Sequence, residues 1–139
     1  METKKRIWKI TISANHYQAI GEGDDAKYFF VGLNNGLQAR KKEIYYNQRT
    51  KDSESFDVIF YPCPDFISYS FFLGFFKDAI DSLIEKLGND NDSNIFYKRQ
   101  IIGLFKAKYV FAFLKNKPES FKKKIDGYLD AAIEERINK

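Results

Sequence analysis

The sequence has little cysteine, histidine or proline. These residue types form disulfides, take part in catalysis or restrict the backbone. Its 139 residues include one cysteine, Cys63, one histidine, His16, and three prolines. A single cysteine excludes an internal disulfide, and a pair of Cys63 with His16 is the remaining route to thiol catalysis. A lone cysteine between two prolines is more typical of a small buried hydrophobe. We therefore expect no catalytic residue and no enzyme.

Long apolar runs and complete cofactor motifs are also missing. Residues 1–10 are basic but lack the apolar core of a signal peptide. The apolar stretch at 66–76 is far shorter than the ~20 residues of a membrane span. Neither a dinucleotide-binding glycine pattern nor a calcium loop is complete. We expect a cytoplasmic protein without a cofactor, a metal ion or a membrane contact.

Aromatic residues are what the sequence has in abundance. Apolar residues make up 44% of the chain and aromatic residues 17%, and fourteen residues are phenylalanine. Such a composition buries enough surface to overcome the entropy cost of ordering the chain. The length suits one domain, and no internal repeat or linker rich in Gly, Ser or Pro divides it. We expect a single domain over residues 1–139.

One stretch, DFISYSFFLGFFKDAIDSLIEKLG, predicts a central helix at about 68–87. Large apolar residues recur there at steps of three and four, and a second apolar stripe with Phe71 and Phe75 flanks the first. Ser68 or Ser70 would cap the N-terminus of this helix. The apolar arc is wider than one sheet face covers, so we expect another surface to contact the helix beside the sheet.

Strand patterns precede the central helix. Residues 6–12 alternate between apolar and polar side chains, and residues 27–31 form a second, shorter apolar run. Residues 56–61 are rich in strand-forming residues and stop at two prolines. Residues 13–26 are polar and rich in Gly, Asn and Asp, which is typical of a loop.

Residues 33–46 are compatible with either a β-hairpin or a helix. Asn35-Gly36 between apolar runs is a strong signal for a hairpin turn, which would make residues 37–46 a strand. The same stretch also holds good helix formers, with apolar residues near one helical face. We favour the helix.

Two further strands and a final helix are predicted after the central helix. Residues 95–102 and 109–114 carry strand-forming residues, with Gly103 between them as a bend. The C-terminal helix is predicted at about 118–137, where apolar residues recur at helical spacing. Asn116, followed three residues later by a glutamate, would cap it.

This order of elements predicts an α/β fold, a mixed β-sheet of about four to five strands packed by helices. Four features follow one another in this order: a short basic helix at 36–43, a buried strand at 56–61, the sequence ISYSF at 67–71, and a strand and helix over 109–137. With this order of elements the chain resembles the STAS-like family, which comprises relatives of sulfate-transporter and anti-sigma-factor-antagonist domains. The resemblance covers residues 30–137.

The resemblance implies a regulatory module that binds a protein partner through the N-terminus of the central helix. The partner would be an ATPase-like kinase or another regulator. The partner-binding residues would be Ser68, Tyr69, Ser70, Phe71 and Phe75. Ser68 and Ser70 would also be phosphoacceptors, because a helix N-terminus favours a phosphate. The alternative is that both serines only cap the helix and face solvent.

Three clusters of basic residues, at 4–6, 40–42 and 122–124, suggest a second function. If they converge in space, a nucleic-acid or nucleotide-binding face would follow. The residues of this face would be Arg40, Lys41, Lys42, Lys122, Lys123 and Lys124. The net charge of +4 is mild, and solvated helix faces balanced by nearby acidic residues are the other explanation.

The central helix also predicts self-association. If the C-terminal helix packs elsewhere on the sheet, Phe71 and Phe75 would form an exposed aromatic patch. We then expect a homodimer, or a hydrophobic partner site, centred on these two rings. A third function, a small inhibitor encoded by a mobile element and acting on a host protein, suits the size and aromatic content equally well.

Overall fold

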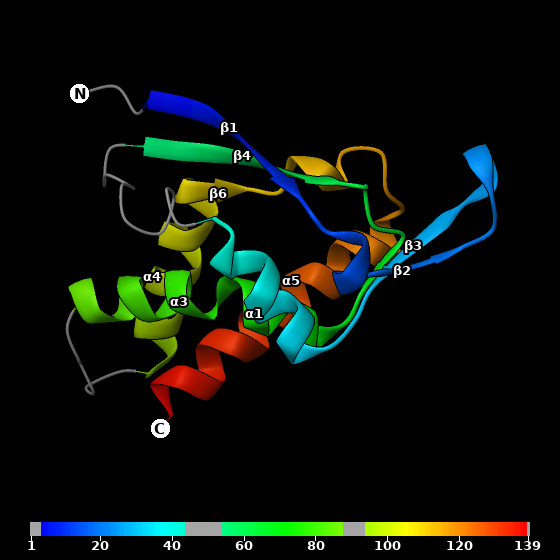
Figure 1. Cartoon of the computed structure of the whole chain (residues 1–139). Helices are drawn as coiled ribbons and strands as arrows, with labels where there is room; N and C mark the ends of the chain where they lie inside the picture. Colours follow the sequence, from blue (N-terminus) through cyan, green and yellow to red (C-terminus); the bar gives the residue numbers. More distant parts are fainter. Residues whose placement is uncertain (1–3, 44–53, 88–93, 139) are drawn as a thin grey trace.

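The computed structural model describes residues 4–43, 54–87 and 94–138 (Figure 1). These residues form two three-stranded sheets and the helices that pack against them. The predicted α/β class is confirmed, with two small sheets in place of one sheet of four to five strands. Within the described ranges, no helix has both the length and the apolar content that crossing a membrane requires.

The first sheet is parallel throughout and has the order β1-β4-β6. Its strands are β1 (Lys4–Thr11), β4 (Glu54–Tyr61) and β6 (Tyr109–Val110). Trp8 of β1 lies beside Val58 of β4, and Ile10 lies beside Phe60. All four side chains are buried, so the alternating pattern of the sequence marks the inner face of this sheet.

The second sheet is mixed and has the order β2-β3-β5. Its strands are β2 (Gln18–Ile20), β3 (Lys27–Phe30) and β5 (Phe66–Ile67). β3 pairs antiparallel with β2 and parallel with β5. Residues 13–26 are therefore not only a loop. The residues of β2 are all exposed, and a strand that buries no side chain leaves no apolar pattern to detect.

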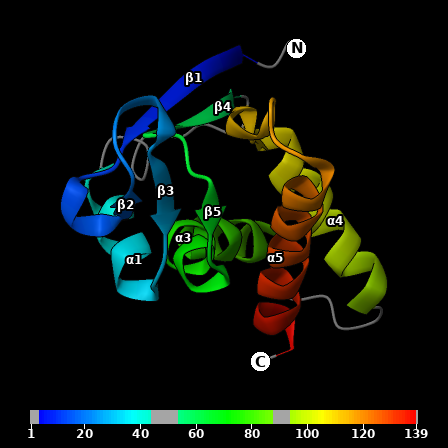
Figure 2. The ribbon, with the colours of Figure 1, turned by 90° about the vertical axis from the view of Figure 1, so that its right-hand side faces the viewer.

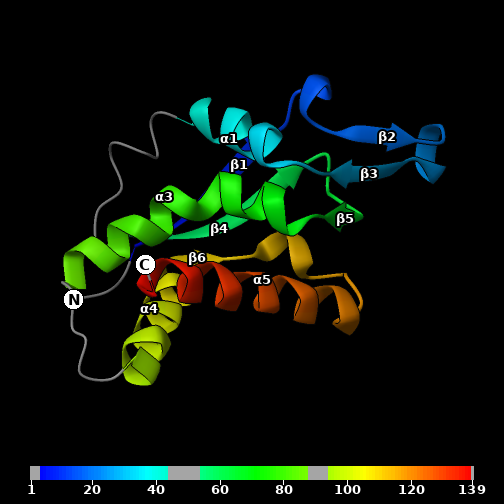
Figure 3. The ribbon, with the colours of Figure 1, turned by 90° about the horizontal axis from the view of Figure 1, so that it is seen from below.

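The helices lie on one side of the β1-β4-β6 sheet (Figures 2 and 3). They are α1 (Leu33–Lys41), α3 (Tyr69–Leu87), α4 (Asn94–Lys108) and α5 (Glu119–Ile137). α3 is the predicted central helix and lies between α1 and α5 (Figure 2). The expectation that other surfaces contact its wide apolar arc is thus confirmed, because helices flank it on both sides.

The strand predicted at 95–102 is wrong, because these residues belong to α4. Tyr97, Ile101 and Phe105 are buried and follow one another at steps of four, which is helical spacing. The aromatic and β-branched residues have a propensity for strands, but the burial of one helical face against the core outweighs this propensity. The strand predicted at 109–114 shrinks to β6 and a 3₁₀ turn, η3 (Ala112–Leu114).

The helical interpretation of the stretch after β3 is confirmed over Leu33–Lys41. Asn35-Gly36 lies inside α1 and makes no hairpin turn. Residues 44–46, which complete the predicted segment, lie outside the described residues.

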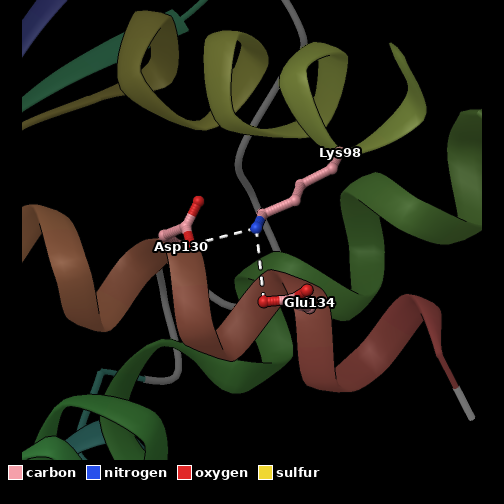
Figure 4. A network of polar contacts seen from close by, with 3 residues as sticks. All are labelled: Lys98, Asp130 and Glu134. Carbon is pink, nitrogen blue, oxygen red and sulfur yellow. Dashed lines mark hydrogen bonds and ion pairs between the residues drawn. The ribbon is translucent and has the colours of Figure 1, made fainter. Parts of the chain in front are cut away.

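The C-terminal helix is confirmed as α5, but its predicted cap is wrong. Pro118 is the N-cap residue, and no side chain caps the helix, so Asn116 does not serve this role. Along α5, Lys98 of α4 donates hydrogen bonds to Asp130 at 2.9 Å and to Glu134 at 3.3 Å (Figure 4). The bond to Asp130 is the main cause that raises the pKa of Lys98. This network ties α4 to α5.

Candidate functional site

A cleft of about 640 Å³ lies where the second sheet meets the start of α5. Its lining residues come from β3, β5 and their flanking segments and from the first turns of α5: Lys27, Phe29, Asp65, Phe66, Asn116, Lys117, Pro118, Ser120, Phe121 and Lys124. We call it the basic cleft. Its volume falls within the ~300–1,000 Å³ of pockets that bind small molecules.

Two ammonium groups of the basic cleft lie over aromatic ring faces. The rings of Phe29 and Phe66, from adjacent strands, lie 6.2 Å apart between their centroids. The Nζ atom of Lys124 lies 5.2 Å from the Phe66 ring centroid, and that of Lys117 lies 5.7 Å from the Phe121 ring centroid. Both lysines are therefore held over aromatic faces by cation–π attraction.

Asp65 is the single carboxylate among the residues that line the basic cleft. Its side chain accepts a hydrogen bond from the Tyr28 backbone N–H at 2.8 Å, and its own N–H donates to the Tyr28 carbonyl at 2.8 Å. Lys117 Nζ lies 3.7 Å from the Asp65 carboxylate. Since Lys27 and Lys124 also line the cleft, the cleft carries an excess of positive charge.

The start of α5 adds to this charge. Pro118, the N-cap residue, and Ser120 of the first turn line the basic cleft, and no side chain caps the helix. The partial positive charge of a helix N-terminus therefore acts in the same direction as the lysines. A ligand that combines an anionic group with a flat ring would find a partner for each part here.

Ser68 confirms the predicted cap of the central helix. Its Oγ atom accepts a hydrogen bond from the Phe71 N–H at 3.0 Å and another from the Gly32 N–H at 3.2 Å. The second bond ties the segment between β3 and α1 to the head of α3. Ser70, two residues further along the chain, is exposed. Phosphorylation of either serine stays a prediction.

Tyr69 joins the head of α3 to α5. Its hydroxyl donates to Glu135 Oε2 at 2.9 Å, and its ring lies 5.7 Å from the ring of Tyr128. Burial, together with the hydrogen bond and the negative charge of Glu135, raises the pKa of Tyr69 to about 12. This side chain therefore already has a partner within the chain.

The prediction that Phe71 and Phe75 form an exposed patch is wrong. Phe71 is 1% exposed and Phe75 is 0% exposed. Phe71 packs against Phe30 of β3 with the ring centroids 5.1 Å apart, and Phe75 packs against Phe60 of β4 at 5.4 Å. The sheets and α1 together enclose the face that the sequence analysis left open, so neither ring is available to a partner.

Arg40 is also not a surface residue, which corrects its prediction as a nucleic-acid contact. It is 6% exposed, and its guanidinium carbon lies 5.1 Å from the Trp8 ring and 5.7 Å from the Phe75 ring. Burial lowers the pKa of Arg40, while the charges of Tyr109, Asp78 and Glu43 raise it by a smaller amount. Arg40 is a cation built into the core.

The remaining predicted basic residues do not converge. Lys41 is exposed, and Lys42 donates to the Ser13 hydroxyl. These two lie at the C-terminal end of α1, whereas residues 122–124 lie near the N-terminal end of α5. Figure 3 shows α3 between the two helices, with the C-terminal end of α1 toward the left of the view and the N-terminal end of α5 toward the right.

On α5, the three consecutive lysines have different surroundings. Lys122 lies 3.9 Å from Glu119, Lys123 is exposed, and Lys124 lines the basic cleft. Lys124 is therefore the one predicted nucleic-acid contact that belongs to the cleft.

Most residues of the basic cleft were missed by the sequence analysis. Some local signal exists, because Lys27 and Phe29 are two apart on a strand and Phe121 and Lys124 are three apart on a helix. Each pair therefore shares one face of its element. The side-by-side placement of β3 and β5, which brings Phe66 to Phe29, has no signal in the sequence.

Cys63 and His16 are the pair that the sequence offered for thiol catalysis. Cys63 is exposed, so the expectation of a buried hydrophobe is wrong, and its Sγ atom lies 3.8 Å from the Phe113 carbonyl oxygen. His16 lies in the 3₁₀ turn η1 (Ala14–His16). Across the described part of the chain, no group of three His, Cys, Asp or Glu residues is placed to hold a metal ion.

Comparison with known proteins returns no match. No family model matches the chain, and neither a curated protein nor a solved structure does.

Proposed function

We propose that the protein is a binding module that takes a nucleotide, or a short single-stranded stretch of nucleic acid, into the basic cleft. The observation that carries this proposal is the set of ammonium groups over ring faces, Lys124 over Phe66 and Lys117 over Phe121. A nucleotide has the matching chemistry, because its base stacks on a ring and its phosphate pairs with a lysine. Single-strand binders use the same combination.

The size and the charge of the cleft support this ligand class. A volume of about 640 Å³ accommodates one nucleotide. The positive lining favours a phosphate, and each phosphate contact with a lysine adds a salt-dependent contribution to the affinity. Lys123, exposed next to Lys124 on α5, lies outside the lining and would not contact a ligand in the cleft.

Binding without a reaction fits the lining better than catalysis does. The cleft lining contains no histidine and no cysteine, and its one carboxylate, Asp65, accepts the Tyr28 N–H and faces Lys117. A general base needs a free acceptor near its substrate. Asp65 instead holds the junction of β3 and β5 together.

Fluorescence anisotropy with a labelled oligothymidylate tests the proposal. We expect Phe66→Ala to weaken binding by about tenfold, because stacking of one base contributes ~1–3 kcal/mol. Lys124→Ala should also weaken binding and should lower the slope of log affinity against log salt by about one. Lys123→Ala is the matched control, and we expect it to bind like the wild-type protein.

Competition separates the two forms of the ligand. If unlabelled nucleoside triphosphate displaces the oligonucleotide at a similar concentration of phosphate groups, the cleft is a mononucleotide site. If only longer strands compete, it is a single-strand site. Absence of binding at low salt for both probes would refute the proposal.

A regulatory interaction module remains our second proposal. Its supporting observation is the exposure of Ser70 in the first turn of α3, where a phosphate would meet the positive end of the helix. Under this proposal, Ser70→Glu changes the capture of a protein partner while the thermal unfolding curve stays the same. Ser82→Glu, at an exposed serine further along α3, is the matched control. Equal capture by wild type and Ser70→Glu would count against a role for Ser70.

A further inference from the structure

A second pocket lies beside the basic cleft and shares one of its lining residues. Its volume is about 290 Å³. Its lining residues come from η1, from β2, β3 and their flanking positions, and from the first turn of α1: Asn15, Tyr17, Gln18, Phe29, Val31 and Asn35. We call it the amide pocket. Phe29 lines both cavities, so they are neighbours.

The strand register places the two cavities on one face of the second sheet. Gln18 of β2 pairs with Phe29 of β3, and Phe29 pairs with Phe66 of β5. Paired residues of neighbouring strands point to the same face, so the three side chains form one row across the sheet. Two strand spacings make this row ~10 Å long. Phe66, at one end, lines the basic cleft, and Gln18, at the other end, lines the amide pocket.

The chemistry of the amide pocket differs from that of the basic cleft. None of its six lining residues, all in the described part of the chain, is charged. Asn15, Gln18 and Asn35 supply carboxamide groups, which both donate and accept hydrogen bonds. Val31, which is 43% exposed, and Phe29 add apolar surface. The pocket therefore suits a flat, uncharged group with a polar edge, and a nucleobase is such a group.

The three amides are accessible to a ligand in different ways. The side chains of Asn15 and Gln18 are exposed. Asn35 is half-buried, and its Nδ2 atom donates a hydrogen bond to the Val31 carbonyl oxygen at 2.9 Å. This bond fixes the orientation of the amide, so its Oδ1 atom can accept a hydrogen bond from a ligand.

From this arrangement we infer that the ligand is a single strand of at least two nucleotides, with one base in the basic cleft and the next in the amide pocket. The inference rests on the proposed function and chooses between its two forms. Successive nucleotides of a stacked strand rise ~3.4 Å along its axis, so a row of ~10 Å is long enough for two of them. A mononucleotide would occupy only one end of the row.

The two cavities then have different roles in recognition. Lysines that pair with phosphates and rings that stack on bases accept any base, so the basic cleft supplies affinity for strands in general. Asparagine and glutamine amides form hydrogen bonds with base edges, and these bonds distinguish one base from another. The amide pocket therefore gives the site a preference among bases.

Two small ligands with equal numbers of phosphates isolate the contribution of the amide pocket. Thymidine 3′,5′-bisphosphate (pTp) has two phosphates and one base, and the dinucleotide pTpT has two phosphates and two bases. In NMR titrations at low salt, we expect pTpT to bind the wild-type protein about tenfold more tightly than pTp, because the second base adds contacts. Their phosphate contacts with the lysines should be similar.

A double variant tests whether this gain arises in the amide pocket. Asn15→Ala/Gln18→Ala removes two exposed amides, so it should fold, which circular dichroism checks. We expect it to bind pTp like the wild-type protein and to lose most of the tenfold advantage of pTpT, since each lost hydrogen bond weakens binding by roughly fivefold. Asn34→Ala is the matched control, because Asn34 is exposed on α1 and lies outside the lining.

Base preference is measured with the same proteins. We expect the affinities of the wild-type protein for pTpT, pCpC and pApA to differ by about fivefold or more. This difference should narrow in Asn15→Ala/Gln18→Ala and persist in Asn34→Ala.

Failure of the inference and failure of the proposed function give different results. Equal affinity of the wild-type protein for pTp and pTpT would overturn the inference and leave the basic cleft as a mononucleotide site. An advantage of pTpT that is unchanged in Asn15→Ala/Gln18→Ala would also overturn it, because the second base would then lie outside the amide pocket. Absence of binding at low salt for both ligands and for oligothymidylate would refute the proposed function and the inference together.

Discussion

Gly36 of α1 and Gly74 of α3 lie in direct contact, so the two helix backbones touch where each lacks a side chain. A Cβ atom on Gly36 would lie 2.3 Å from the Phe71 carbonyl oxygen, and one on Gly74 would lie 2.4 Å from the Leu33 carbonyl oxygen. Both distances are far inside van der Waals contact, so only glycine fits at either position. This contact lets α1 pack directly against α3, so that α1 covers the Phe75 side chain.

Gly36→Ala should destabilise the protein by about 2 kcal/mol or more. The clash is with backbone atoms of α3, so the two helices must separate, and this cost exceeds the ~1 kcal/mol that alanine gains within a helix. Gly103→Ala in α4 is the control, because its Cβ would meet nothing within 4 Å, and we expect it to stabilise by ~0.5–1 kcal/mol. Urea denaturation measures both, and equal effects would contradict the close contact.

Arg40→Ala should also destabilise the protein, by about 2–4 kcal/mol, because it removes a buried side chain and leaves a cavity. Its guanidinium lies 5.1 Å from the ring of Trp8, the single tryptophan, so we expect the tryptophan emission spectrum to change as well. Oligonucleotide affinity of the folded variant should equal that of the wild type. Lys41→Ala, at the exposed neighbour, should change stability by no more than about 0.5 kcal/mol.

The burial of Tyr69, together with its hydrogen bond to Glu135, predicts a loss of stability at high pH. The pKa of Tyr69 rises from 10.0 to about 12 in the folded protein, so above pH 10 the unfolded chain loses this proton first. Ionisation then favours unfolding, and the contribution of Tyr69 is complete below pH 10 and is lost as the pH rises through 12. We expect the free energy of unfolding of Tyr69→Phe to fall less steeply across this range. Identical slopes would argue against a raised pKa.

The sequence predicted correctly those helices and strands that can be identified from their pattern of apolar residues alone. β1, β4, α3 and α5 each bury one regular stripe or face, and their bounds differ from the prediction by a few residues. α4 failed because strand-forming residues at 95–102 also have helical spacing, and tertiary packing selected the helix.

Close approach between elements was the part that the sequence could not supply. Asn35-Gly36 signals a turn when only neighbouring residues are considered, yet Gly36 is required where α1 meets Gly74. Arg40 looks like a surface cation until Trp8 and Phe75 are placed around it. The basic cleft combines β3, β5 and α5, and these are far apart in the sequence.

An NMR titration tests the central claim, that the basic cleft binds nucleotides, most directly. An unlabelled oligothymidylate is added to isotope-labelled protein at low salt, and the backbone amide shifts are followed. The account predicts that the largest shift changes fall on Lys27, Phe29, Phe66, Lys117, Phe121 and Lys124. Changes centred on Lys41 and Lys42 at the end of α1, or no changes at all, would contradict it.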